Sequence, residues 1–383
     1  MTEAAQTANL RAELNDRGVR LLGGDRSIEL HPLWLRERSK GGHEVDARTS
    51  QRLYAPAAVP LDLAVVSCSL DASTARIDLN DGTSLSLDLH LLLIDIGWVS
   101  DIELPPLPVP WSAPLTTKPV VDWPQLLAHD REYTRDALAA LFRDGYLILT
   151  GVDCVDGRVG DVANFFGRIA PTTFGAIFDV VSAPNSVDLA YSSLALAAHS
   201  DMPYRRPVPG LQLLHTLKND TDGGDSLLVD GFAAAAALRE TDADGYAVLT
   251  SLPIDFRYDI GTDAMRHQCP IIELDVHGEP RCIRFSPRID YAPPAPTSVL
   301  DLYYRARAWL AEWLNSADHM ARFRLQSGEV MLFDNHRILH GRTAFNDRQG
   351  ERHLQGAYID HDGIHTHWQL LQRSHARSNE THP

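Results

Sequence analysis

A histidine and a carboxylate stand two residues apart in the stretch LALAAHSDMPYRRPVPG, residues 194–210. Residues i and i+2 of a β-strand project from the same face, so His199 and Asp201 could meet one cation if a strand runs through them. The spacing alone is weak evidence, because His277 and Glu279 repeat it in VHGEP, which lies between two apolar runs and predicts a hairpin turn. A metal site at His199 therefore needs a further ligand from elsewhere in the chain.

Two further histidines, His336 and His340, stand four residues apart in GEVMLFDNHRILHGRTAF. On a helix this spacing would suit zinc. The run before them is strand-like and Asp334 and Asn335 are turn formers, so we expect only one of the two histidines to be a ligand. Arg352 follows in ERHLQGAYIDHD, where its guanidinium could bind a carboxylate through a bidentate fork.

Two histidines and one carboxylate leave about three open positions on an octahedral ion, as is typical of non-haem Fe(II) oxygenases. The same ligands with a bound water would also serve a zinc hydrolase. Two further alternatives need no metal. The residues could be a hydrogen-bonded pair in a core with Arg352 in a surface ion pair, or the protein could bind a ligand without catalysis.

The order and spacing of His199, Asp201, His340 and Arg352 resemble the Fe(II)/2-oxoglutarate dioxygenases of the taurine dioxygenase superfamily. The phrases PVPGLQLLHTLKNDTDGGDSLLVDGF, FDNHRILHGRTAF, RHLQGAYID and LHPLWLRER are similar to its γ-butyrobetaine and trimethyllysine hydroxylase branch. The resemblance implies that the two histidines and Asp201 bind Fe(II), and that Arg352 and Ser226 contact 2-oxoglutarate. It also implies oxidative decarboxylation to succinate and CO2 with hydroxylation of a substrate. A zinc hydrolase would release no succinate.

The resemblance further implies an aromatic cage for a trimethylammonium group. The segment TTFGAIFDVV offers Phe174 and Phe178, and DLAYSS offers Tyr191. Both phenylalanines could instead be core residues. The family's N-terminal domain usually carries a cysteine-rich zinc site, but WLRERSKGGHEVDARTSQRL contains no cysteine, and His43 alone cannot replace a thiolate cluster. We therefore expect no structural zinc.

Three substrate positions differ from those of the family. Asp188 stands where an Asn is usual, Met202 where a Tyr is usual, and FSPR, which ends in Arg288, where FNNR is usual. Arg288 could take an anionic substrate group and Asp188 a cationic one. We expect hydroxylation of a small zwitterion, such as a quaternary amine with a carboxylate or phosphonate, or an amino acid, rather than γ-butyrobetaine itself. The same machinery could alternatively catalyse desaturation, demethylation or rearrangement.

Composition limits the partners of this chain of 383 residues. Its 35 Lys and Arg against 51 Asp and Glu give a formal charge of −16, which disfavours nucleic acid and anionic membranes. The four cysteines show no C-x-x-C spacing, and no segment has the pattern of a signal peptide or a membrane span. We expect a cytoplasmic protein with small-molecule partners, and the resemblance adds a homodimer.

The helices and strands that position these residues can be predicted from turn-forming residues and from the periodic spacing of apolar residues. Residues 1–103 contain short strand-like runs (18–24, 27–38, 64–70 and 75–89), the last of which has Asn80-Asp81-Gly82 as a hairpin signal. Prolines interrupt residues 104–119, which we interpret as a linker. In residues 120–383, apolar residues at helical spacing predict helices over 123–145, 158–170 and 298–315. Apart from the last of these helices, strands and loops dominate from about residue 190 onward.

The expected fold class is therefore mainly β with flanking helices. The spread of strands in residues 120–383 suggests a sandwich or jelly roll, and the resemblance implies a double-stranded β-helix. Residues 1–103 would form a small β-rich domain resembling the N-terminal domain of γ-butyrobetaine hydroxylases.

Overall fold

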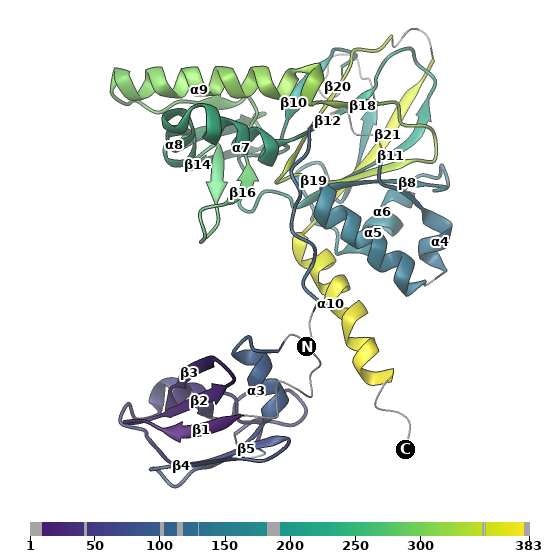
Figure 1. Ribbon diagram of the computed structural model, residues 1–383. Coiled ribbons are helices and arrows are strands. Elements are labelled where there is room, and N and C mark those ends of the chain that lie inside the picture. Colours follow the sequence, from purple (N-terminus) through teal and green to yellow (C-terminus); the bar gives the residue numbers. More distant parts are fainter. Residues whose placement is uncertain are drawn as a thin grey trace. The chain divides into compact units, whose positions relative to one another are not determined.

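The structure, a computed structural model, describes residues 10–41, 44–99, 103–112, 118–128, 130–181, 192–346, 348 and 350–378. The chain divides into two compact units, Met1–Glu103 and Leu104–Pro383 (Figure 1). Among the described residues, no helix combines the length and apolarity that crossing a membrane requires.

The first unit contains two antiparallel sheets of three strands each. One is formed by β1 (Arg11–Leu14), β2 (Val19–Gly23) and β3 (Arg26–Leu30), the other by β4 (Val65–Leu70), β5 (Thr74–Leu79) and β6 (Ser84–Asp88). The predicted hairpin is confirmed, since β5 and β6 pair and Gly82 has a φ of 86° in the turn between them. The described part of the unit also contains the helices α2 (Pro32–Arg36) and α3 (Leu89–Asp95) and the short η1 (Pro56–Ala58).

One strand-like run of this unit was predicted too long. Residues 27–38 begin as β3, but α2 (Pro32–Arg36) follows within the same run. Pro32 occupies the first turn of the helix, where its missing N–H costs nothing, and the His31 side chain accepts a hydrogen bond from the N–H of Leu33 at 3.2 Å. The chain therefore turns away from the sheet at the proline.

Two sheets form the core of the second unit and confirm the mainly β, jelly-roll fold class (Figure 1). The six-stranded sheet has the order β7-β8-β19-β11-β21-β9, and the four-stranded sheet the order β10-β20-β12-β18. Their bounds are β7 Val120–Asp122, β8 Tyr146–Thr150, β9 Ile177–Val181, β10 Leu196–His199, β11 Leu211–Asn219, β12 Ser226–Asp230, β18 Ala321–Phe323, β19 Val330–Asp334, β20 Ile338–Arg342 and β21 Arg352–Ile359.

Apolar side chains from both sheets meet in one cluster. Tyr146 of β8 and Met331 of β19 come from the larger sheet, and Leu228 of β12 and Ile338 of β20 from the smaller one. Strand β19 reads VMLFD with Val330–Phe333 fully buried, which explains its unbroken apolar run. This packing fixes the two sheets against each other and leaves the cavity described below between them.

Helices α4 (Trp123–Leu127), α5 (Arg131–Asp144), α6 (Arg158–Phe166) and α10 (His361–Ser378) pack around a second apolar cluster with the six-stranded sheet. The sequence indicated one helical stretch over 123–145, but the structure has two helices. Asp130 starts the second by accepting a hydrogen bond from the N–H of Tyr133, and Gly145 ends it with a φ of 79°.

A segment between β12 and β18 contains three helices and five short strands: α7 Gly231–Thr241, α8 Ala243–Ser251, β13 Ile254–Asp259, β14 Ala264–Cys269, β15 Ile272–Leu274, β16 Pro280–Ile283, β17 Asp290–Tyr291 and α9 Thr297–Asn315, followed by η3 Ala317–His319. The predicted helix over 298–315 is confirmed as α9. Strands and loops dominate after about residue 190, as expected, but the sequence indicated only one helix there, whereas the structure also has α7, α8 and α10. The alanine-rich α7 has high intrinsic propensity, and Asp230 caps it by accepting from Phe232 and Ala233.

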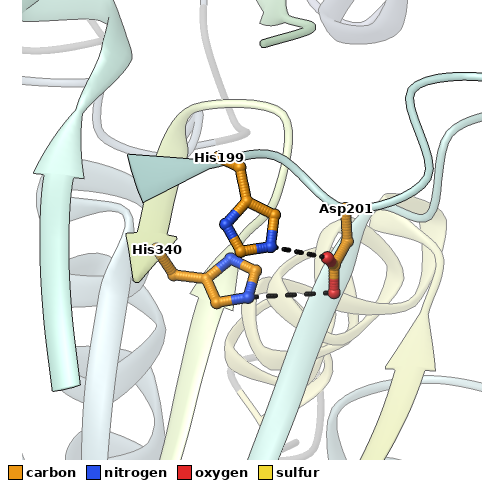
Figure 2. A group of neighbouring side chains, drawn as sticks. All are labelled: His199, Asp201 and His340. Carbon is orange, nitrogen blue, oxygen red and sulfur yellow. Dashed lines mark ion pairs between the residues drawn. The ribbon is translucent and has the colours of Figure 1, made fainter. Parts of the chain in front are cut away.

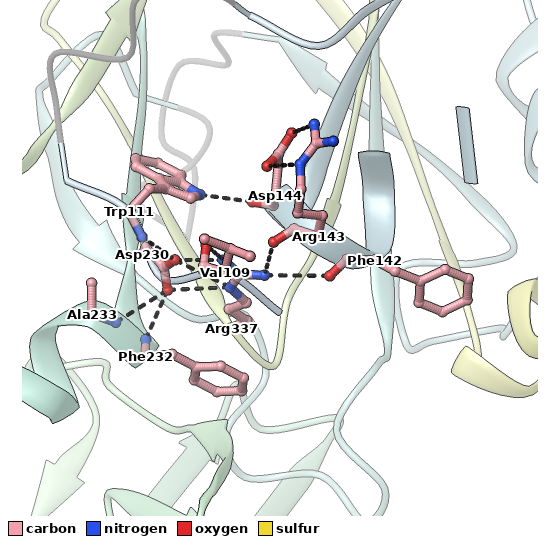
Figure 3. A network of polar contacts seen from close by, with 9 residues as sticks. All are labelled: Val109, Trp111, Phe142, Arg143, Asp144, Asp230, Phe232, Ala233 and Arg337. Carbon is pink, nitrogen blue, oxygen red and sulfur yellow. Dashed lines mark hydrogen bonds and ion pairs between the residues drawn. The ribbon is translucent and has the colours of Figure 1, made fainter. Parts of the chain in front are cut away.

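The turn 335–337 between β19 and β20 is held by a buried ion pair (Figure 3). Arg337 Nη2 lies 2.7 Å from Asp230 Oδ2, and these side chains are 1% and 0% exposed. The same guanidinium donates to the carbonyl oxygens of Arg143 at 2.8 Å and Val109 at 2.7 Å. The backbone N–H of Trp111 also donates to Asp230. One buried, fully partnered pair thus joins the end of β12, helix α5 and residues 109–111 to this turn.

Candidate active site

The structure brings His199, Asp201 and His340 together (Figure 2). Strands β10 and β20 are paired, with His199 opposite His340, so the two imidazole rings lie 4.5 Å apart. Asp201 Oδ1 is 3.4 Å from His199 Nε2, and Asp201 Oδ2 is 3.8 Å from His340 Nε2. The prediction that His199 and Asp201 share one strand face was wrong, because β10 ends at His199 and Asp201 lies in the bend that follows.

The protonation states of this triad suit a metal. Nδ1 of His199 is 2.9 Å from the carbonyl oxygen of Ala197 and donates to it, which fixes the orientation of the ring. Burial lowers the pKa of His340 to about 3, so this ring is neutral near pH 7. Burial alone would raise the pKa of Asp201, but the interactions with His340, His199 and Tyr358 outweigh it and lower that pKa. One carboxylate and two imidazoles form a ligand set that suits both Fe(II) and zinc.

Tyr358 holds one oxygen of the carboxylate. Its hydroxyl donates to Asp201 Oδ2 at 2.7 Å. This contact was not predicted, although the sequence contained a signal for it. Arg352 and Tyr358 are both on β21 and six residues apart, and an even separation places them on the same face of the strand. Both line the cavity.

A cavity of about 550 Å³ between the sheets contains the triad and most of the predicted site residues. Ser226, Met202, Arg288 and Arg352 all line it. Ser226 lies at the start of β12, opposite Arg342 of the neighbouring strand. The structure thus collects residues separated by up to half the chain around one space of ligand size.

Arg352 is a partly buried cation. Among the described residues its guanidinium has neither a hydrogen-bond nor an ion-pair partner, and its Nε is buried; the ring centroid of Phe345 lies 5.3 Å from the guanidinium carbon. Burial, together with the charges of Arg342 and Arg324, lowers its pKa to about 10. Burying an unpaired charge is costly, so this geometry is that of a site for an anion.

Aromatic rings line the cavity and form what we call the aromatic wall: Phe174, Phe178, Tyr204, Tyr258 and Tyr358. Phe178 stacks on Tyr358 with ring centroids 5.3 Å apart, and Tyr204 stacks on Tyr258 at 4.7 Å. Phe178 can approach β21 this closely because residue 356 is glycine; a Cβ there would lie 2.3 Å from the phenylalanine ring. Tyr204 and Tyr258 were not predicted.

Several predicted residues do not join the triad. His336 lies elsewhere, with Nε2 3.1 Å from the carbonyl oxygen of Val208. His277 and Glu279 lie between β15 and β16, which confirms the predicted turn. Asp188, Tyr191 and His43 lie outside the described residues, and the absence of a structural zinc stays a prediction.

His336 instead borders an ion pair between Asp334 and His361, whose Oδ1 and Nε2 are 2.9 Å apart. Burial alone would lower the pKa of His361, but Asp334 outweighs it and raises that pKa. Burial alone would raise the pKa of Asp334, but the charge of His361 and its hydrogen bond lower it to about 2. Asp360 and Asp362 also favour the charged form of His361, and burial together with the charge of His361 lowers the pKa of His336.

This pair predicts a pH-dependent stability. The contribution of His361 is complete below its unfolded pKa of about 6.5 and is lost as the pH rises through its raised value, while that of Asp334 is lost as the pH falls from about 4 toward 2. We expect His361→Asn to lower the free energy of unfolding by about 1 kcal/mol near pH 5.5, or roughly 2–4 °C, and by less at pH 9. Thermal unfolding across this pH range checks it, with the exposed His277→Asn as the matched control. If His361→Asn lowered the free energy of unfolding by the same amount at every pH, the ion-pair explanation would be contradicted.

Comparisons with known proteins place these observations in a family. Residues 104–358 match the family described as "Taurine catabolism dioxygenase TauD, TfdA family". A gamma-butyrobetaine dioxygenase from Pseudomonas sp. (strain AK-1) is 32% identical over 363 residues, which cover 93% of this chain and 94% of that protein. The gamma-butyrobetaine dioxygenase of Homo sapiens is 31% identical over 269 residues, 69% of each chain. Dioxygenase str8 of Strobilurus tenacellus is 28% identical over 359 residues, which cover 88% of this chain and 84% of that protein. With the family match spanning most of the second unit and the bacterial relative aligned along nearly the whole chain, this protein belongs to the TauD/TfdA family of dioxygenases.

Proposed function

We propose that the protein is an Fe(II)- and 2-oxoglutarate-dependent hydroxylase of a small zwitterion. One observation carries the proposal: a His-His-Asp ligand set lines the same cavity as Arg352, a partly buried arginine that has no ion-pair partner among the described residues. A zinc hydrolase could use the ligand set but has no need of a buried site for a second anion. An iron enzyme that binds a dicarboxylate cosubstrate uses both.

Each residue then has a defined task. His199, His340 and Asp201 would hold the metal, and Tyr358 keeps one carboxylate oxygen of Asp201 occupied by a hydrogen bond. Arg352 would bind the distal carboxylate of 2-oxoglutarate, with Ser226 as a second contact. When bound, Fe(II) and 2-oxoglutarate would supply the chemistry in which O2 oxidises both substrates: one oxygen atom enters the succinate formed with release of CO2, and the other replaces a substrate C–H by C–OH. The apolar walls exclude water from this reaction.

The substrate end of the cavity supports a zwitterion. The aromatic wall offers ring faces to a cation, although Phe174 and Phe178 are weaker cation–π partners than Trp. Arg288 lines the cavity and has no ion-pair partner among the described residues, so it is available for an anionic group. Asp188 and Tyr191 remain candidate substrate contacts. Because several relatives are gamma-butyrobetaine or trimethyllysine dioxygenases, a quaternary amine is the favoured cation. The same residues would also serve desaturation, demethylation or rearrangement.

A succinate-release screen tests the function. Apo-protein loaded with Fe(II) is incubated with oxygen, 2-oxoglutarate and a panel of betaines, aminophosphonates and amino acids, and the products are identified by mass spectrometry. We expect one class to stimulate succinate formation and to gain oxygen, and His199→Ala to abolish both. If no compound stimulates succinate formation above the level of His199→Ala, the proposal fails. A product that loses two hydrogens or a methyl group would favour the alternative outcomes.

Arg288 predicts the charge of the substrate. Burial and, second to it, the charge of Arg288 lower the pKa of the nearby Arg342 to about 10, which supports a positive charge of Arg288 close to the cavity. We expect Arg288→Gln to raise KM for an anionic substrate about tenfold, the loss of one partly exposed charge-assisted contact. The KM for 2-oxoglutarate should stay within about twofold because Arg352 is retained. Steady-state kinetics with each compound varied in turn measures both values, and an unchanged substrate KM would remove Arg288 from the site.

We also propose that the protein is a cytoplasmic homodimer in which residues 120–383 form the catalytic domain, 104–119 a linker and 1–103 an accessory domain. The resemblance supports the dimer, and the scattered cysteines, all unpaired in the structure, support a reducing compartment. Light scattering during size-exclusion chromatography measures the oligomeric state.

A further inference from the structure

Asn335, in the turn 335–337, is connected to Asp201 by its side chain. It is 1% exposed, and all of its amide hydrogen bonds go to the backbone of the bend that follows β10. Oδ1 accepts from the N–H of Asp201 at 2.8 Å, and Nδ2 donates to the carbonyl oxygens of Asp201 and Pro209, both at 3.1 Å. The sequence identified Asn335 only as a turn former.

These contacts restrict the direction of the Asp201 side chain. The N–H of a residue belongs to the peptide plane before its Cα, and the C=O to the plane after it. Because one amide side chain holds both groups of Asp201, it limits φ and ψ of this residue and hence the direction of its Cα–Cβ bond. Asp201 lies outside the strand ladder, so no sheet hydrogen bonds perform this task.

The backbone next to Asp201 requires such support. Met202 has a φ of 52°, a region that residues other than glycine adopt only at a cost. On the other side, the N–H of Ser200 donates to the carbonyl oxygen of Phe285 at 2.9 Å, and Ser200 Oγ accepts from the N–H of Phe285 at 2.9 Å. Asn335 thus completes a set of contacts that holds an irregular bend in one conformation.

The turn that carries Asn335 is itself fixed. The backbone N–H of Asn335 donates to the carbonyl oxygen of Gly210 at 2.9 Å. Two residues further along the chain, the buried Arg337 forms an ion pair with Asp230 (Figure 3). Strand β20, which begins after this turn, carries His340. The same turn is therefore connected to one proposed ligand through the chain and to another through the Asn335 amide.

We propose that Asn335 is a positioning residue that directs the carboxylate of Asp201 toward His199 and His340, and that the metal affinity of the triad depends on it. This inference rests on the proposed function, because it assumes that the triad binds a metal. Partners that orient metal ligands typically contribute about 10–100-fold to metal affinity when they are removed by mutation.

The test measures Co(II) binding to metal-free full-length protein by the Co(II) absorption spectrum and by the metal-induced rise in melting temperature. The variants are Asn335→Ala, Asn335→Ser as a milder truncation should alanine prevent folding, and His199→Ala as the reference for a lost ligand. Val159→Ala is the matched control, because Val159 is fully buried in α6 and belongs to the apolar cluster that packs on the outer helices rather than to the cavity. It should reduce stability without reaching the triad.

We expect Asn335→Ala and Asn335→Ser to raise the Co(II) dissociation constant about 10–100-fold and to change the Co(II) absorption spectrum. Val159→Ala should leave the dissociation constant within about twofold of the wild-type value and the spectrum unchanged. An unchanged affinity and spectrum in the folded Asn335 variants would overturn the inference, as would an equal loss in Val159→Ala. Wild-type protein that binds Co(II) no better than His199→Ala would instead overturn the proposed function, so the two failures are distinguishable.

Discussion

Replacing Asp201 by alanine is expected to reduce succinate formation by more than about 100-fold, beyond the loss typical of residues that only orient a ligand. The carboxylate is the one anionic ligand of the triad, and its oxygens lie 3.4 Å and 3.8 Å from the imidazole nitrogens of His199 and His340. Without it, the two imidazoles must hold a dication with no anionic ligand. The measurements are Fe(II) affinity of the apo-protein and succinate release at saturating iron.

Glu279→Ala is the matched control for this variant. His277 and Glu279 repeat the spacing of His199 and Asp201, but they lie in the turn between β15 and β16, and Glu279 forms only an exposed ion pair with Arg239. Exposed pairs contribute little, so Glu279→Ala should retain full activity. If Asp201→Ala retained full activity, the assignment of the triad as metal ligands would be wrong.

The second large effect is expected at Arg352. A buried guanidinium can bind a carboxylate through two parallel hydrogen bonds, and truncating one partner of such a pair costs about 2–5 kcal/mol, roughly 30-fold to more than 1,000-fold in affinity. We expect Arg352→Ala to raise KM for 2-oxoglutarate by this amount. Arg352→Lys should recover only part of it, because an ammonium keeps the charge but lacks the planar fork. Fe(II) affinity without cosubstrate should stay near wild type.

Arg322→Ala controls for the loss of a positive charge. Arg322 belongs to β18 of the smaller sheet, but its side chain is 63% exposed and pairs with Asp225 at the surface. Its replacement should leave KM for 2-oxoglutarate within about twofold. If Arg352→Ala also leaves KM unchanged, the buried arginine serves another purpose and the cosubstrate must bind elsewhere.

Local chemistry made much of the fold predictable from the sequence. The hairpin at Gly82, the helix over 297–315 and the strand that ends at Asp334 follow from turn residues and periodicity within short windows. The failures also have local causes. Asp130 caps a second helix inside a continuous periodic run, and Asp230 begins α7 directly after a buried strand, where no loop separates the two elements.

The sequence by itself identified His199, Asp201, His340 and Arg352 as site residues, because their order and the phrases around them resemble those of the dioxygenase family, whereas their spacing alone is weak evidence. Only the tertiary structure decided how they meet. Asp201 lies off the strand, and its direction depends on Asn335, which is 134 residues away along the chain. Tyr358 reaches the same carboxylate across 157 residues. Periodicity predicts side-chain directions only in regular backbone, whereas in a bend they are set by hydrogen bonds from distant residues, which no local pattern in the sequence encodes.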